Sequence, residues 1–183
     1  MGQEADGLEL ERHRAYLCLL ARKHLDHQLW RLKDPSSLVQ NVLLDAHRKS
    51  EQCRGQTEGQ RRAWLRAMLL NDLKDAIRKF GRIAEHEQPI QQAIDQSSVW
   101  IDASLAAEQS SPDQRAMQDE ELKRLADALA RLPEAEREAV TLLHLFDWTQ
   151  AEAAAHLGRT RPAVAGLLRR GLNKLRKLLD NPE

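Results

Sequence analysis

The sequence predicts an all-α fold of two small helical domains joined by a flexible linker, and three observations lead to this prediction. Aromatic residues make up only 4% of the 183-residue chain, and strand-type alternation is nearly absent. Apolar residues, mostly Leu and Ala, recur instead at spacings of three and four. The charges sum to zero but are segregated, with seven Lys or Arg in residues 61–82 and nine Asp or Glu in residues 83–121. We therefore expect two basic modules, residues 1–82 and 116–183, and an acidic linker over residues 83–115.

The N-terminal module is expected to contain three helices. The first covers Glu9 to Leu32, and the second runs from Leu38 to about Lys49, with Ser36 or Ser37 as its cap. A polar loop with two glycines, Cys53 to Gly59, separates it from a third helix that runs from Gln60 to about Phe80. The cations predicted on the polar side of this helix and just beyond it are Arg62, Arg66, Lys74, Arg78, Lys79 and Arg82.

Residues 83–112 have weak periodicity and many Gln and Ser, which is typical of a mobile linker. The C-terminal module is expected to begin with a helix over Glu120 to Ala130. Leu132 and Pro133 then separate it from a helix over Glu134 to Phe146.

The segment from Thr149 onward has the local signals of a helix-turn-helix. Thr149 and Glu152 stand at the spacing of a capping box, in which each side chain accepts a backbone amide of the other. Gly158 suits the left-handed conformation that ends a helix. Thr160 is a second candidate cap, and Pro162 falls in the first turn of the next helix, where its missing N–H costs little.

The second helix of this motif is basic on one face. From Gly158 to Lys177 there are seven Lys or Arg and no Asp or Glu. Its apolar stripe is predicted to be Val164, Leu168, Leu172, Leu175 and Leu179. A helix-turn-helix places the N-terminal residues of its second helix against base edges, so Arg159, Thr160 and Arg161 are candidates for base contacts and Arg169, Arg170 and Lys174 for phosphate contacts. The alternative is a solvated basic face on a helical hairpin.

Two glycines, Gly166 and Gly171, lie inside this second helix. Each costs up to about 1 kcal/mol relative to Ala, which argues against a helix selected only for stability. A glycine at such a position can allow another backbone to approach closely.

Composition excludes several other classes of protein. The two cysteines, Cys18 and Cys53, fit no CxxC pattern, which favours a reducing cytoplasm without a zinc site. His24 and His27 have no third ligand nearby, so we expect no metal and no cofactor. No signal peptide or membrane span is apparent. No grouping of His, Asp, Ser or Cys recurs at a spacing suited to catalysis, so an enzyme is disfavoured.

The order of several short motifs resembles that of bacterial RNA polymerase sigma factors of the sigma-70 family. These motifs are Ser37 to Ala46, Arg54-Gly55, Trp64-Leu65-Arg66 with Asn71-Asp72-Leu73, and Leu132-Pro133 followed by the helix-turn-helix. The chain shows two such modules, and in this it resembles the extracytoplasmic-function type of sigma factor, which keeps only regions two and four. The stretch Ala163 to Leu172 is similar to forms abundant in planctomycete-like bacteria. The resemblance extends from about Leu10 to Leu179.

The resemblance implies a non-enzymatic protein whose partners are core RNA polymerase and promoter DNA. The implied polymerase-binding residues are Leu38, Gln40, Asn41, Leu44 and Asp45. Here the chain departs from the family, because Ser37 and Asn41 stand where Asp and Glu are usual. The implied contacts to the minus-ten element are Arg54, Gln56, Asn71, Lys74, Arg78, Lys79 and Arg82. Those to the minus-thirty-five element are Arg159, Thr160, Arg161, Ala165, Arg169, Arg170 and Lys174. Family members are often held by an anti-sigma factor, which would be a further partner.

Two other functions compete with this interpretation. A stand-alone helix-turn-helix regulator would bind operator DNA as a dimer, with half-sites about one helical turn apart, and would bind tightly without polymerase. A helical adaptor would bind polymerase without contacting DNA. A sigma factor differs from both, because its free form binds DNA weakly and selects promoters only within the holoenzyme.

Overall fold

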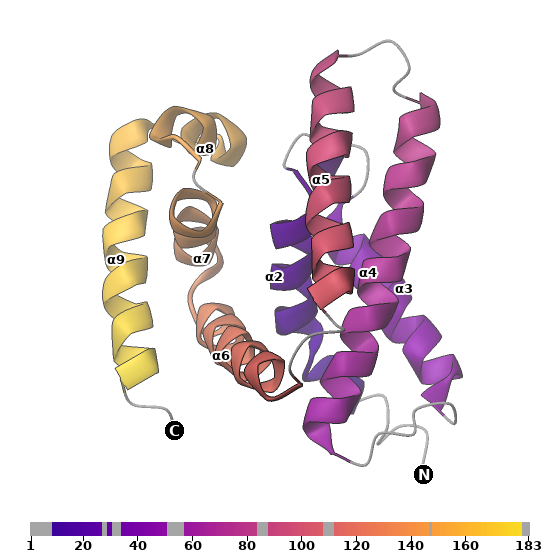
Figure 1. Cartoon of the computed structure of the whole chain (residues 1–183). Coiled ribbons are helices and arrows are strands. Elements are labelled where there is room, and N and C mark those ends of the chain that lie inside the picture. The colour runs from indigo at the N-terminus through magenta and orange to yellow at the C-terminus, as the bar shows by residue number, and fades with distance from the viewer. Residues whose placement is uncertain are drawn as a thin grey trace. The chain divides into compact units, whose positions relative to one another are not determined.

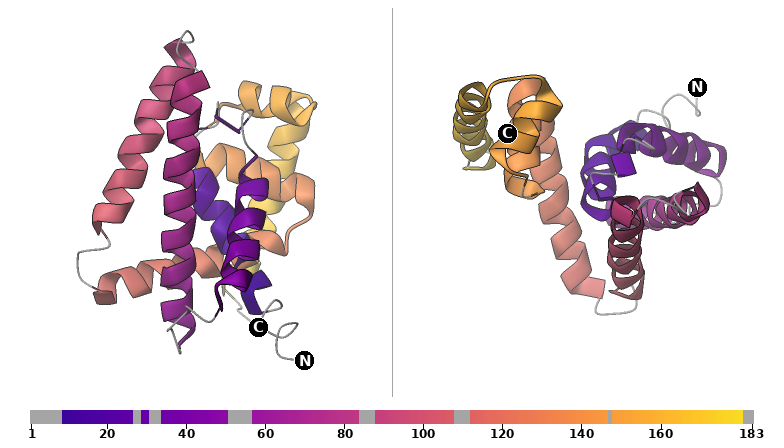
Figure 2. Two further views of the ribbon diagram at one scale, coloured as in Figure 1. Left: turned by 90° about the vertical axis from the view of Figure 1, so that its right-hand side faces the viewer. Right: turned by 90° about the horizontal axis from the view of Figure 1, so that it is seen from above.

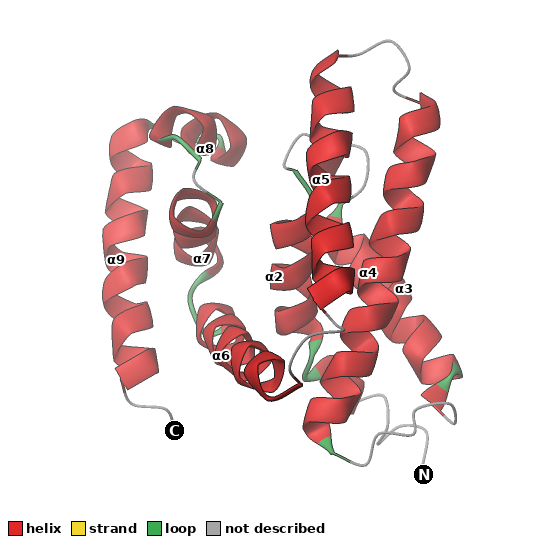
Figure 3. Cartoon of the chain, viewed as in Figure 1, coloured by secondary structure: helices red, strands yellow, loops and turns green. Residues whose placement is uncertain are grey.

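The computed structural model describes residues 9–26, 29–30, 34–50, 57–83, 88–107, 112–146 and 148–180, and every regular element in them is a helix (Figure 3). Figures 1 and 2 show the elements as ribbons. The all-α prediction is therefore confirmed for the described residues. The chain divides into two compact units between Lys123 and Arg124, beyond the predicted start of the C-terminal module at residue 116.

The N-terminal unit is built from α2 (Arg14–His24), α3 (Pro35–Arg48), α4 (Glu58–Ile83) and α5 (Gln88–Ala107), together with the start of α6 (Pro112–Ala130). Its core is mainly aliphatic. The fully buried side chains include Tyr16, Leu17, Leu20, Leu65, Leu69, Leu73 and Ile101. The helix predicted over Glu9 to Leu32 is shorter in the structure, because α2 ends at His24 and Leu25 is already extended.

Helix α3 begins earlier than the sequence suggested. The carboxylate of Asp34 accepts a hydrogen bond from the Ser37 backbone N–H at 3.0 Å, and Pro35 occupies the first helical turn. Asp34 is thus the cap, and the prediction of Ser36 or Ser37 is wrong. An Asp followed directly by Pro satisfies both preferences of a helix N-terminus, because the carboxylate accepts a free amide and Pro has none to satisfy.

Most of the predicted linker is helical. Helix α5 lies beside α4 (Figure 1) and buries Ala93, Ile94 and Ile101. Ser97 on the same face is fully buried, and its Oγ accepts a hydrogen bond from the Asp26 N–H at 2.9 Å. The buried positions do recur at helical spacing, but one is a serine and one an alanine, which weakens the apolar pattern in the sequence.

The C-terminal unit contains the rest of α6, then α7 (Glu134–Val140), a π-helical turn η3 (Thr141–Leu145), α8 (Gln150–Leu157) and α9 (Arg161–Asp180). The predicted helix over Glu134 to Phe146 is therefore present but widens in its last turn. Helix α9 packs on α7 and α8. Ala139, Val140, Leu142, Ala153 and Val164 form the buried centre of these helices.

Candidate nucleic-acid interface

The turn between α8 and α9 has the local geometry that the sequence predicted. The Thr149 Oγ1 accepts a hydrogen bond from the Glu152 N–H at 3.2 Å, and the Glu152 Oε2 accepts one from the Thr149 N–H at 2.8 Å. Gly158 ends α8 with φ +61°. A side chain would be strained at this φ, so Gly158 allows α9 to follow after a short turn. The capping box and the glycine C-cap are confirmed.

The N-terminus of α9 is exposed to solvent. Arg159, Thr160 and Arg161 are all exposed, and the Thr160 hydroxyl accepts a long hydrogen bond of 3.4 Å from the Ala163 N–H. Ala165, one turn later, is half-buried. Free backbone amides at a helix N-terminus and two adjacent guanidinium groups make this end of α9 attractive to anions. Arginine can also bind guanine with two hydrogen bonds in a DNA major groove.

The buried face of α9 is rotated slightly from the predicted stripe. Val164 and Leu175 are buried as predicted, but Leu168, Leu172 and Leu179 are only half-buried. Leu167 and Gly171 take their places against the other helices. The predicted stripe contains only large apolar residues, and a pattern of large side chains cannot include a glycine that fits a close contact.

Gly171 lies at a close approach of α9 to α7. A Cβ atom placed on Gly171 would lie 2.7 Å from the Val140 Cγ2 and 3.0 Å from the Glu136 carbonyl oxygen. A Cβ on Gly166 would meet only the end of the Arg170 side chain, at 3.4 Å. The predicted role of an internal glycine in close packing therefore holds for Gly171 and does not extend to Gly166.

The close approach brings an acidic side chain of α7 to the basic face of α9. The Glu136 Oε2 lies 2.8 Å from the Lys174 Nζ, and its Oε1 lies 3.4 Å from the Arg170 Nε. Hydrogen bonding to Lys174, opposed by burial, lowers the pKa of the Glu136 carboxyl group. Two of the three predicted phosphate contacts are thus already paired with a carboxylate. Arg169 is exposed, and the described residues offer it no ion pair.

On α4, the predicted minus-ten contacts fall along an exposed side of the helix. Asn71, Lys74 and Arg78 are exposed and spaced by three and four residues, which places them in one row. Lys79 is also exposed. Arg82 belongs to the last turn of α4, but its side chain is outside the described set, and Arg54 and Gln56 lie outside the described residues altogether.

Arg62 and Arg66, which were placed on the polar face of this helix, are instead part of a buried polar cluster. The Arg66 Nη1 lies 2.7 Å from the Asp119 Oδ1, which also accepts a hydrogen bond from the Tyr16 hydroxyl at 3.0 Å. Arg62 is paired with Glu120. The prediction that these two arginines lie on the polar side of the helix is therefore wrong, because the start of α6 supplies the carboxylates with which they pair. Their pairing partners are more than fifty residues away in sequence.

The predicted polymerase-binding residues of α3 separate into one buried and four accessible positions. Leu38 is 5% exposed and belongs to the core with Val39 and Val42. Gln40, Asn41 and Leu44 are exposed, and Asp45 is half-exposed. The Gln40 Oε1 accepts a hydrogen bond from the Arg14 Nη2 at 2.6 Å, which holds its side chain against α2. Leu44, 47% exposed, is a large apolar side chain left open to solvent.

The described residues contain neither a group of metal ligands nor a membrane-spanning helix. No group of three or more His, Cys, Asp and Glu there is arranged to hold a metal ion. His24 is buried, with its Nε2 3.4 Å from the Ser104 Oγ, and His27 is outside the described residues. In the part of the chain that the structure describes, no helix has the length and apolar character needed to cross a membrane.

Comparison with known proteins gives two matches. Residues 122–175, which include α7, α8 and most of α9, match the family model described as sigma-70, region 4. The chain is also similar to the RNA polymerase sigma factor CnrH of Cupriavidus metallidurans, with 34% identity over 119 residues. The aligned residues are 65% of this chain and 60% of that relative's length.

Proposed function

We propose that this chain is a dissociable sigma factor of the sigma-70 family and of the extracytoplasmic-function type, which directs core RNA polymerase to promoters. The observation that carries the proposal is the coincidence of the region 4 match with a capped helix-turn-helix whose α9 N-terminus is basic and exposed. Its action would be non-enzymatic, would need no cofactor, and would take place in the cytoplasm.

In this proposal α9 enters the major groove at the minus-thirty-five element. Arg159, Thr160 and Arg161 would contact base edges, and their exposure at the N-terminal end of the helix supports this assignment. Ala165 would face a thymine methyl or the sugar backbone. Arg169, Arg170 and Lys174 would contact phosphates, with the last two exchanging part of their pairing with Glu136 for the DNA.

We assign minus-ten recognition to the first module, residues 1–82, and minus-thirty-five recognition to residues 116–183. The exposed row of Asn71, Lys74 and Arg78 would lie along the separated strand, with Lys79 beside it. Arg54, Gln56 and Arg82 complete the proposed contacts on the basis of the family resemblance alone. Residues 83–115 would connect the two functions, although α5 also contributes to the folded N-terminal unit.

Polymerase would bind the outer face of α3. Gln40, Asn41, Leu44 and Asp45 are accessible there, whereas Leu38 supports the helix from the core. Leu44 is the expected centre of this contact, since buried apolar side chains at the middle of an interface contribute most of its affinity. We expect Leu44→Asp to weaken binding to core polymerase by about tenfold. The matched control is Met117→Asp on α6, a large apolar side chain that is 69% exposed and lies outside this face.

The test of the function is in vitro transcription from a pool of random promoter sequences by core polymerase, with and without the protein. A sigma factor should enrich two short sequence blocks at a fixed separation, only when both proteins are present. The free protein should bind the enriched DNA weakly. Tight binding of the free protein as a dimer to a palindromic site, without promoter selection by polymerase, would instead identify a stand-alone regulator.

The negative charge of residues 83–115 is a second point to test. In sigma factors of this type the connector passes through channels that otherwise take nucleic acid, and acidic side chains can imitate a phosphate chain there. Replacing Asp95, Asp102 and Glu108 with Ser should change core binding or the yield of abortive transcripts. Unchanged initiation and unchanged abortive products would contradict this part of the proposal.

A further inference from the structure

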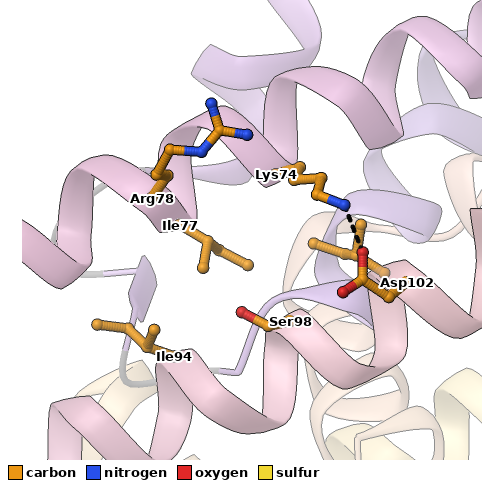
Figure 4. A pocket seen from close by; sticks show the side chains of 7 residues that line it. Lys74, Ile77, Arg78, Ile94, Ser98 and Asp102 are labelled. Carbon is orange, nitrogen blue, oxygen red and sulfur yellow. Dashed lines mark hydrogen bonds and ion pairs between the residues drawn. The ribbon is translucent and has the colours of Figure 1, made fainter.

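Helix α4 holds two later helices of the N-terminal unit by different means. Helix α5 is held by apolar contact, because Ile77 of α4 and Ile94 of α5 are both buried and face each other across a pocket of about 340 Å³ (Figure 4). At the pocket rim the Lys74 Nζ lies 2.6 Å from the Asp102 Oδ1, and these side chains are 46% and 59% exposed. An ion pair this exposed contributes little. Burial of the isoleucines therefore accounts for most of the attachment of α5.

The start of α6, residues 112–123, is attached in the opposite way. Among residues 116–123, whose side chains the structure describes, Asp119 is the one buried residue. Met117 is 69% exposed, and Leu122 is only half-buried. Apolar burial by this stretch of α6 is therefore small, and it contributes little to the attachment.

Two adjacent carboxylates make this attachment instead. The Asp119 Oδ1 lies 2.7 Å from the Arg66 Nη1 and accepts a hydrogen bond from the Tyr16 hydroxyl at 3.0 Å, and Glu120 is paired with Arg62. The two arginine side chains are only 8% and 13% exposed. Removing such charges from water costs free energy that largely offsets the attraction within the pairs. The contact is thus specific in its geometry but weak in net free energy, and the groups that it covers on α2 and α4 are polar and can be hydrated.

Both attachments hold the connector, residues 83–115, on the N-terminal unit. The connector begins at the end of α4, passes beside α4 as α5 and leads into α6, whose start is again paired with α4. In the proposed function the connector passes through polymerase channels, so at least one of the two attachments has to open. The ionic attachment of α6 is the one that buries little apolar surface, and it is therefore the one expected to open.

We propose that residues 112–123 form an ionic latch, which holds the connector on the N-terminal unit of the free protein and opens when the chain binds core polymerase. This inference rests on the proposed function and adds a self-inhibiting step to it. A protein whose binding-competent form is only partly populated has an apparent affinity reduced by that fraction. Weakening the latch should therefore tighten binding to polymerase.

Hydrogen exchange of the full chain, measured by mass spectrometry, tests the latch without polymerase. A detached helix of this length is marginal in water, so its amides exchange in proportion to the open fraction. Tyr16→Phe removes a hydrogen bond to Asp119 and keeps the ring in the core, and Glu120→Gln removes an ion pair. Each should speed exchange of residues 112–123 by about fivefold. The matched control is Glu121→Gln, the same change of charge on the next residue, which is exposed and should exchange like the wild type.

Salt provides a second comparison within one molecule. Mobile ions stabilise charges that have separated, so a higher salt concentration should speed exchange of residues 112–123 in the wild-type protein. Helix α5, which is held by apolar contact, should not respond in this way. Unchanged exchange of α2 and α4 in each variant would show that the core of the unit is still folded.

The affinity for core polymerase, measured with the same four proteins, tests the opening step. Tyr16→Phe and Glu120→Gln should bind core polymerase several-fold more tightly than the wild type, because less free energy is needed to open the latch. Glu121→Gln should bind with the wild-type affinity.

Three outcomes would overturn the proposal. Equal exchange of residues 112–123 in all four proteins would mean that the carboxylates do not hold α6. Faster exchange in the two latch variants, with unchanged or weaker binding to polymerase, would mean that the latch does not open during assembly. If the wild-type protein does not bind core polymerase, the proposed function fails and the opening step fails with it, whereas the exchange rates still show whether the carboxylates hold α6.

Discussion

The contact at Gly171 gives opposite expectations for two glycine substitutions in the same helix. Replacing either glycine with Ala raises helix propensity, which stabilises α9 by roughly 0.5–1 kcal/mol. At Gly166 the new methyl group meets only the end of the Arg170 side chain at 3.4 Å, which can move. Gly166→Ala should therefore raise the free energy of unfolding by roughly that amount.

At Gly171 the methyl group would lie 2.7 Å from the Val140 Cγ2 and 3.0 Å from the Glu136 backbone. Backbone cannot yield as a flexible side chain does, and overpacking of this kind costs about 1–3 kcal/mol. Since the propensity gain is common to both variants, the difference between them measures the overpacking cost alone. We expect Gly171→Ala to be less stable than Gly166→Ala by about 1–3 kcal/mol.

Urea unfolding of the full chain, followed by far-ultraviolet circular dichroism, measures both variants under the same conditions. Equal stabilisation by the two substitutions would refute the reasoning, because it would mean that α7 and α9 are not in close contact at Gly171. A loss of stability in Gly166→Ala would refute it equally, since no rigid neighbour lies there.

Five other substitutions have definite expected outcomes. Arg161→Ala should weaken the binding free energy for the preferred promoter by about 1–3 kcal/mol and relax base preference, whereas Lys177→Ala should weaken binding to all sequences alike. A competition assay with holoenzyme and different promoter sequences distinguishes the two effects. Unchanged promoter choice in Arg161→Ala would mean that the base contacts lie elsewhere. Thr149→Ala should lower the free energy of unfolding by about 1 kcal/mol through loss of the α8 cap, and equal midpoints for wild type and variant in urea would contradict this. Burial lowers the pKa of His24 from 6.5 to about 4, so the folded state disfavours protonation of this side chain. The contribution of His24 to the free energy of unfolding should therefore be complete above pH 6.5. It should fall by up to about 3 kcal/mol as the pH drops from 6.5 to about 4. His24→Gln should remove that part of the acid sensitivity, as measured by unfolding at several pH values. Glu136→Gln should tighten binding to all DNA sequences, because Lys174 is then released from its carboxylate, and weaker binding would show that Glu136 instead holds the cations in place for phosphate.

The helix-turn-helix was predictable from the sequence because its signals are local. Thr149 and Glu152 are three residues apart, and Gly158 needs no distant partner to adopt its conformation. Each of these preferences acts within one helical turn, so the local sequence alone predicts where α8 begins and ends. The exposed N-terminus of α9 follows directly from the turn.

The pairing of charges was not predictable in the same way. Arg66 and Asp119 are separated by fifty-three residues, and nothing near either one indicates that they meet. The same holds for Glu136 with Lys174 and for Lys74 with Asp102. A cation in a sequence is expected on an exposed face, and this expectation fails for Arg62 and Arg66, where the start of α6 supplies the carboxylates.

Helix α5 was missed for a third reason, which concerns the size of the buried side chains. Its inner face includes Ala93 and Ser97 as well as two isoleucines. Small and polar residues add little to an apolar pattern, yet Ser97 is buried because its hydroxyl satisfies the Asp26 amide. The sequence therefore did not predict the pocket beside Ile94, because α5, which forms one of its walls, lies in a segment that was expected to be irregular.

The pairing of Arg170 and Lys174 with Glu136 also bears on how the protein would respond to ionic strength. Each bound phosphate that a cation neutralises releases counterions from DNA, and this makes affinity fall as salt rises. A cation that already faces a carboxylate contributes only part of its charge to that exchange. Binding should therefore vary less steeply with salt than the seven Lys and Arg between Gly158 and Lys177 would suggest. Such a protein would be retained less by arbitrary genomic DNA, which leaves more of it available to the polymerase.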